Sequence, residues 1–169
     1  DVKKGNVGSF IYVDGAQRTH ELQQLAVDST RLGIPLLFGF DVLHGYKTMM
    51  PMPIAMASSW NEDLIKKCAQ VSAKEAASSG LHWTFAPMID VSRDARWGRI
   101  VESSGEDPYL NAVVAKATVE GLQGNSLADT LTIAACAKHF AGYGFAEAGI
   151  DYNTAELSEQ TLRDVVFPP

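Results

Sequence analysis

Three segments of the sequence place charged side chains directly after apolar runs. The segment GFDVLHG contains Asp41 and His44, and the segment KHFAGYG contains Lys138 and His139. Between them, APMIDVSRDARWGRIVESSGEDPYL concentrates arginines and carboxylates in one stretch. Carboxylates accept hydrogen bonds, whereas lysine and arginine donate them. Together these groups can hold an uncharged ligand rich in hydroxyl groups, such as a sugar.

Asp41 ends an apolar run and precedes a turn. At this position its carboxylate can accept hydrogen bonds from two adjacent sugar hydroxyls, although the position also suits an aspartate that caps a turn. His44 follows in the same loop. We expect this histidine to pack the loop or to support a binding residue from behind.

The central stretch is open to two interpretations. Asp90, Glu102 and Glu106 are interspersed with arginines that include Arg99. So many opposite charges can form an ion-pair network that pins the loop, but the planar fork of arginine also suits the binding of sugar hydroxyls. Trp97 fits either a platform for a sugar ring or a side chain that packs the loop.

Lys138 and His139 are adjacent, and adjacent residues of a regular strand point to opposite faces. If both contact one ligand, we expect irregular backbone geometry at this point. Two alternative roles stay open: Lys138 could form a Schiff base as in barrel aldolases, and His139 could be a packed core residue. No two histidines share a helical turn, so we expect no metal ion, and no motif calls for a cofactor.

The elements that must position these side chains alternate between short apolar runs and stretches of helical period, which is typical of parallel β/α units. Expected strands span residues 7–13, 36–42, 83–89 and 131–140. A closed eight-unit β/α barrel needs roughly 250 residues. The chain is therefore expected to be α/β, a partial TIM-type barrel of about four β/α units with parallel strands, treated as a single domain over residues 1–169.

Helices are expected between the strands. The first spans residues 19–32, and the second opens at Ser59 with Glu62 as a capping-box partner. The third opens at Asp107 followed by Pro108, and a fourth starts at Ser158. The side chains expected to face inward are Leu22, Leu25 and Leu32 in the first helix, Leu64, Ile65, Cys68 and Val71 in the second, and Leu110, Val113, Val114 and Ala117 in the third.

In a β/α barrel the loops after the strands form the catalytic face. We therefore expect Asp41, Arg99, Lys138 and His139 to converge on one concave face at the carboxyl ends of the strands.

Composition excludes several classes of partner. The net charge is −6, the pI is about 5.1, and no basic block occurs, so nucleic acid is a poor candidate. No apolar run reaches the ~18 residues of a membrane helix, and no signal peptide is recognisable. The two cysteines, Cys68 and Cys136, are expected to be free thiols.

The ordered set GFDVLHG, APMIDVSRDARWGR with ESSGEDPYL, and KHFAGYG resembles the N-terminal barrel domain of glycoside hydrolase family 3, in particular periplasmic bacterial β-glucosidases. The resemblance implies that Asp41, Arg99, Lys138 and His139 bind the non-reducing-end sugar of a β-glucoside or oligosaccharide. It also implies that Glu102 and Glu106 support the arginine and its loop, and that Asp90 is a loop aspartate rather than the nucleophile.

The resemblance further implies that the nucleophile and the acid/base lie downstream, so that no catalytic carboxylate belongs to this chain. It implies a retaining β-glucosidase as the intact parent and a periplasmic or secreted location. The segment FAEAGIDYN lacks the histidine of the branch that cleaves N-acetylglucosaminides. A stand-alone half-barrel that binds sugar or assembles with a partner remains an alternative. In either case we expect self-association or dependence on the rest of a barrel.

Overall fold

The computed structural model describes all 169 residues and contains one parallel sheet. Its strands follow chain order, with β2 (Leu37–Phe40) between β1 (Ser9–Ile11) and β3 (Trp83–Thr84). Ser9 pairs with Leu37, and Gly39 pairs with Trp83. Parallel neighbours need crossover connections, and helices supply them here.

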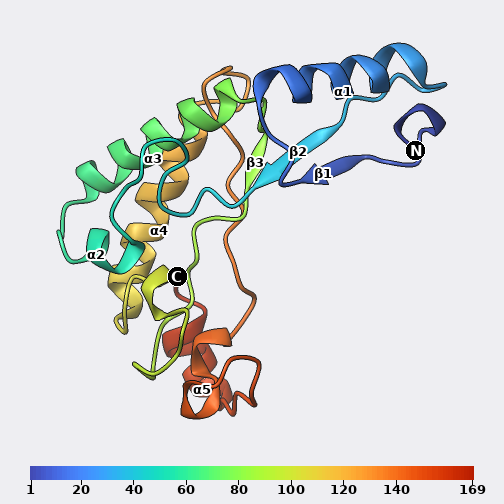
Figure 1. Cartoon of the computed structure of the whole chain (residues 1–169). Coiled ribbons are helices and arrows are strands. Elements are labelled where there is room, and N and C mark those ends of the chain that lie inside the picture. Colours follow the sequence, from blue (N-terminus) through green and yellow to red (C-terminus); the bar gives the residue numbers. More distant parts are fainter.

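The helices lie along the outer side of a curved molecule, while the strands and their extensions line its inner side (Figure 1). None of the helices is long and apolar enough to cross a membrane. The α-helices are α1 (Ala16–Ser29), α2 (Pro53–Ala57), α3 (Glu62–Ser78), α4 (Pro108–Gln123) and the short α5 (Glu159–Thr161), which continues into a π-helical turn (Leu162–Val166).

After α4 the chain returns beside β3 in parallel, but as an extended segment rather than a regular strand. Two isolated bridges join it to the preceding segment, Trp83–Ala134 and Met88–Lys138. The expected strand over residues 131–140 is therefore wrong as a regular strand, and so are residues 85–89 of the strand expected over 83–89. The numbering difference between paired residues falls from 51 at the first bridge to 50 at the second, so the register shifts by one residue between them.

Helix α1 ends before Leu32, which was expected to be buried and is 61% exposed. The Thr30 hydroxyl donates to the Ala26 carbonyl (2.6 Å) and accepts from the Gly33 amide (3.1 Å), and these contacts stabilise a helix end at Ser29, three residues earlier than expected. Thr19 and Ala26 are the buried residues of α1, while the expected Leu22 and Leu25 are only half-buried.

Helix α3 is capped by Asn61, whose side chain accepts from the Leu64 amide at 3.0 Å. The expected cap Ser59 instead donates to the Met56 carbonyl. Leu64 and Val71, expected to face inward, are largely exposed. The buried stripe of α3 consists mostly of small residues, because α4 packs closely against it: Ile65, Ala69, Ser72, Ala73 and Ala76.

Two other predicted helix starts are confirmed. Asp107 caps α4 by accepting from the Leu110 amide (2.6 Å), with Pro108 in the first turn. Ser158 caps α5 by accepting from the Thr161 amide (3.1 Å). Both caps satisfy amides that have no partner within the helix.

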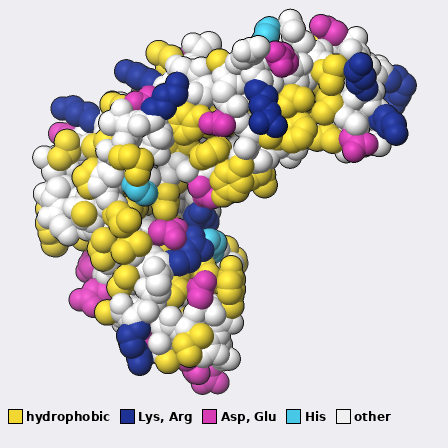
Figure 2. Space-filling model, viewed as in Figure 1, with side chains coloured by type: hydrophobic (Ala, Val, Ile, Leu, Met, Phe, Trp, Pro, Cys, Tyr) yellow, Lys and Arg dark blue, Asp and Glu magenta, His cyan; other side chains and the backbone are white.

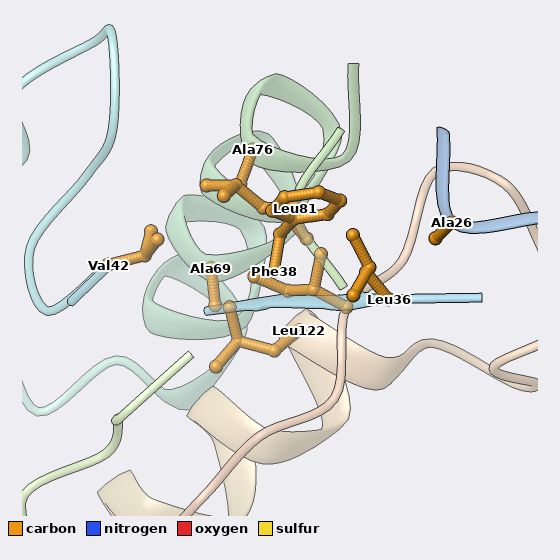
Figure 3. Close-up of a cluster of buried hydrophobic side chains, with 10 residues drawn as sticks. Ala26, Leu36, Phe38, Val42, Ala69, Ala76, Leu81 and Leu122 are labelled. Carbon is orange, nitrogen blue, oxygen red and sulfur yellow. The ribbon is translucent and has the colours of Figure 1, made fainter. Parts of the chain in front are cut away.

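The main core lies between the sheet and the helices α1, α3 and α4. Phe38 of β2 is fully buried at its centre, with Leu36, Leu81 and Leu122 around it (Figure 3). Burying side chains of this size stabilises the fold by about 1.5–3 kcal/mol each. A smaller cluster fixes α2 to α3 and α4 and contains Ala57, Ile65, Val114 and Ala117.

Gly121 marks the closest approach of α3 and α4. A Cβ atom there would lie 2.5 Å from the Lys66 carbonyl oxygen and 2.6 Å from the Ala69 Cβ. We expect Gly121→Val to lower the free energy of unfolding in urea by at least about 2 kcal/mol, because the helices must separate. Gly98→Ala is the control, since its Cβ would meet nothing within 4 Å. Equal unfolding midpoints for the two variants would contradict the close packing.

Candidate functional site

Charged side chains gather where the inner ends of the parallel strands meet. Asp41 follows β2 directly, and Lys138 ends the extended segment beside β3. Although they are far apart in sequence, Lys138 Nζ donates to Asp41 Oδ1 at 2.8 Å. Figure 2 shows acidic, basic and histidine side chains side by side in the inner bend of the molecule.

Asp41 receives a second hydrogen bond from the Tyr12 hydroxyl, which reaches its Oδ2 from the end of β1. Burial raises the pKa of Asp41, but the hydrogen bonds from Lys138 and Tyr12, with the nearby charge of Arg99, outweigh burial and hold that pKa below its ordinary value. Asp41 is therefore ionised at neutral pH and can accept hydrogen bonds from ligand hydroxyls.

His139 is held by Asp90, which lies almost fully buried after the third strand. Asp90 Oδ2 accepts from the His139 backbone amide at 3.0 Å and lies 2.7 Å from its ring Nδ1. A proton on Nδ1 satisfies this contact and leaves Nε2 to accept from Arg99 Nη1, 3.4 Å away. The Lys138–His139 peptide bond is cis, so the predicted irregular geometry is confirmed.

Arg99 is oriented by Glu102 through two parallel hydrogen bonds, Nε to Oε1 (2.7 Å) and Nη2 to Oε2 (2.6 Å). The hydrogen bonds with Glu102 raise the pKa of Arg99 further, although burial opposes them. Glu106, expected to support the same arginine, is exposed and forms no ion pair with it. That expectation is wrong for Glu106, because the bidentate contact with Glu102 already occupies one edge of the guanidinium.

The predicted convergence of Asp41, Arg99, Lys138 and His139 on one face is confirmed by these contacts. His44 lies apart from them and packs its own loop, with ring Nδ1 3.2 Å from the Met50 carbonyl oxygen.

Aromatic residues that have no distinctive pattern in the sequence complete the site. The Tyr143 ring packs edge-on against His139 (4.7 Å between centroids) and against Trp97 (5.1 Å), and Arg99 lies over it at 5.3 Å. Trp97 is 1% exposed and donates to Asp151 at 3.0 Å. Trp97 therefore packs the loop and offers no platform to a ligand.

A surface hollow of ≈ 390 Å³ adjoins the cluster. Its lining combines polar groups with aromatic rings, which suits a ligand with both hydroxyl groups and apolar C–H faces. The lining includes Arg99, His139, Phe140, Tyr143, Tyr152 and Asn153.

We expect Asp90→Ala to lower the free energy of unfolding by about 3 kcal/mol, because the amide and ring of His139 lose a buried acceptor. Urea denaturation measures this loss. Asp94→Ala is the control in the same loop, because Asp94 pairs with the exposed Arg96 and such exposed pairs contribute little to stability. A cost for Asp90→Ala no larger than that of the control would count against this anchor.

The fold and the cluster together define an α/β protein of the β/α-barrel class, with a cluster of polar side chains at the carboxyl ends of its strands. The family model described as "Glycosyl hydrolase family 3 N terminal domain" matches residues 1–169, and the chain belongs to this family.

The relatives include glycosidases of two specificities. The chain is 43% identical to a periplasmic β-glucosidase of Salmonella typhimurium, over 99% of this chain and 22% of that protein. It is 39% identical to a β-xylosidase of Formosa agariphila, over 90% of this chain and 23% of that protein. The chain thus spans about a fifth of the length of these relatives.

Solved structures agree with this assignment. The β-glucosidase of Listeria innocua in complex with glucose superposes with a TM-score of 0.93 at 45% identity, covering 96% of this chain and 23% of that one. The predicted α/β fold class, parallel strands alternating with outer helices of a β/α barrel, is confirmed by this similarity.

Proposed function

We propose that this chain forms the glucose-binding part of a longer retaining β-glucosidase, which hydrolyses terminal non-reducing β-D-glucosyl residues. In this proposal residues 1–169 are the N-terminal portion of the barrel domain, in a periplasmic or secreted enzyme. The observation that carries it is a pair of contacts at the carboxyl ends of the strands. Lys138 donates to Asp41, and the next residue, His139, contacts Arg99.

Each of the four side chains then has a defined task. Ionised Asp41 accepts hydrogen bonds from sugar hydroxyls, while Lys138 and Arg99 donate to hydroxyl oxygens. His139, with Nδ1 held by Asp90, presents Nε2 to the ligand and to Arg99. Such contacts accelerate the reaction where they strengthen as the sugar ring distorts toward an oxocarbenium ion.

The carboxylates within the cluster are all engaged. Asp41 is bound by Lys138 and Tyr12, Glu102 by Arg99, and buried Asp90 by His139. Retaining hydrolysis needs a nucleophilic carboxylate roughly 5–5.5 Å from a second carboxyl group that serves as acid/base, and in this proposal the three carboxylates of the cluster instead orient neighbouring side chains. We therefore propose that the nucleophile and the acid/base come from other parts of the longer protein.

A β-xyloside is the second candidate substrate, favoured by the 39% identity to the Formosa agariphila β-xylosidase. Schiff-base chemistry at Lys138 has less support, because Lys138 Nζ is held by the Asp41 carboxylate at 2.8 Å, whereas a Schiff-base lysine must direct this nitrogen at a substrate carbonyl.

Steady-state kinetics of the full-length protein test the proposal. We expect a higher kcat/KM for 4-nitrophenyl β-D-glucopyranoside than for the β-D-xylopyranoside, with β-glucose as the first product. A preference for the xyloside would make the protein a xylosidase. Sugar binding without turnover of either substrate would support a non-catalytic sugar-binding protein, and covalent trapping of a carbonyl substrate by borohydride at Lys138 would support an aldolase.

A further inference from the structure

Tyr12 lies at the carboxyl end of β1, where it takes part in the cluster without being charged. Its hydroxyl donates to Asp41 Oδ2, while Lys138 donates to Asp41 Oδ1 at 2.8 Å. Each carboxylate oxygen therefore has one fixed donor, and the two donors come from opposite sides of β2 in the sheet. Two such contacts prevent the carboxylate from rotating.

The backbone of Tyr12 has φ 59°, a left-handed conformation that is uncommon for any residue other than glycine. Its amide donates to the Gly39 carbonyl at 3.0 Å, and its ring packs edge-on against Phe40 at 5.1 Å between centroids. Burial does not account for this arrangement, because Tyr12 is 59% exposed. Unfavourable conformations held by surrounding contacts are concentrated at functional sites.

We infer that Tyr12 is a positioning residue that orients the Asp41 carboxylate for sugar binding. This inference rests on the proposed function. With each oxygen held by one donor, the remaining lone pairs of Asp41 keep a fixed direction toward adjacent hydroxyls of the sugar. Removing the Tyr12 hydroxyl leaves Asp41 held by Lys138 alone and free to turn.

The same hydroxyl affects the titration of Asp41. Burial raises the pKa of Asp41, whereas Lys138, Tyr12 and the charge of Arg99 lower it. Loss of the Tyr12 hydrogen bond therefore raises the pKa of Asp41 toward its ordinary value. Sugar binding that needs ionised Asp41 is then lost at a higher pH as the solution is acidified.

The chain offers a closely matched control in Tyr46. Tyr46 also packs edge-on against Phe40, at 5.7 Å, and also donates to a carboxylate, that of Asp14. Tyr46→Phe thus removes an equivalent hydroxyl next to the same ring without touching Asp41. Tyr12→Phe keeps the ring and its packing, so both variants are expected to fold.

The test measures glucose affinity by calorimetry between pH 4 and pH 8, with KM and kcat for 4-nitrophenyl β-D-glucopyranoside, in the full-length protein. For Tyr12→Phe we expect Kd and KM to rise about three- to tenfold, as loss of one hydrogen bond implies. We also expect kcat to stay within about twofold. The pH below which glucose binding is lost, which is the acidic limb of the binding curve, should move to a higher value. Tyr46→Phe should match the wild type.

If Tyr12→Phe has the wild-type Kd and the wild-type acidic limb, or if Tyr46→Phe changes both equally, the inference is overturned. These results are distinct from failure of the proposed function. That failure would appear in the wild-type protein as absence of glucoside turnover, whereas failure of the Tyr12 inference leaves the wild type active and Tyr12→Phe equal to it.

Discussion

Replacing Lys138 by methionine in the full-length protein is expected to lower kcat/KM for 4-nitrophenyl β-D-glucopyranoside by about a thousandfold. Methionine keeps the length of the side chain and removes its charge. The change eliminates the hydrogen bond to Asp41 and the proposed one to the sugar, and hydrogen bonds to charged groups contribute about 1.5–3 kcal/mol each. A combined loss of about 4 kcal/mol corresponds to a factor of about a thousand in rate.

Lys66→Met is the matched control for this prediction. Lys66 forms a similar lysine–carboxylate pair, 2.7 Å from Glu120, but this pair lies on the outer surface between α3 and α4. We expect the control to keep kcat/KM within about twofold, since exposed pairs contribute little to stability. If Lys138→Met retains more than a tenth of the activity, Lys138 is not part of the sugar site.

The 169-residue chain on its own is expected to show no detectable turnover of aryl β-glucosides. In the proposed function the carboxylates of its cluster orient neighbouring side chains, while the nucleophile and the acid/base lie elsewhere in the longer protein. Without a nucleophile the covalent route of a retaining enzyme is closed. The measurement compares the purified chain with the full-length protein in the same assay.

Asp90→Asn separates the two possible origins of any activity that is found. Turnover by the isolated chain that is abolished in Asp90→Asn would identify Asp90 as the nucleophile and contradict the prediction. Activity that appears only in the longer protein, and persists measurably in Asp90→Asn, would agree with it. We also expect the isolated chain to self-associate, because Phe140 is 95% exposed and stacks on Phe167, which is 48% exposed, so that two aromatic rings form one exposed apolar patch.

The sequence predicted the elements whose signals are local. The cap Asp107 and the apolar run at β2 each depend on a few neighbouring residues, and both predictions are confirmed. Leu32 was placed in the core because its spacing continues the pattern of Leu22 and Leu25, whereas the helix ends before it. Periodicity alone cannot locate that end, because a threonine side chain and the following turn determine it.

The residues of the site also differ in whether the sequence carries a signal for them. Asp41, Arg99, Lys138 and His139 stand out by residue type at the ends of apolar runs, so their convergence could be predicted. Tyr12 and Tyr143 were missed because an exposed or ring-packing tyrosine carries no recognisable signal in sequence. Glu102 and Glu106 look alike in the chain, and the 3-10 turn Ile100–Glu102 that follows Arg99 is what brings Glu102 to the arginine.

The contacts of the cluster join residues that are far apart along the chain: 97 positions separate Lys138 from Asp41, 49 separate His139 from Asp90, and 29 separate Tyr12 from Asp41. Closing loops of this length costs conformational entropy before any contact forms, and folds dominated by such contacts assemble slowly. The cluster has little local structure of its own to form early. We therefore expect its geometry to form late in folding, after the parallel strands have paired, so that recovery of the site during refolding would follow completion of the whole chain rather than of any single element.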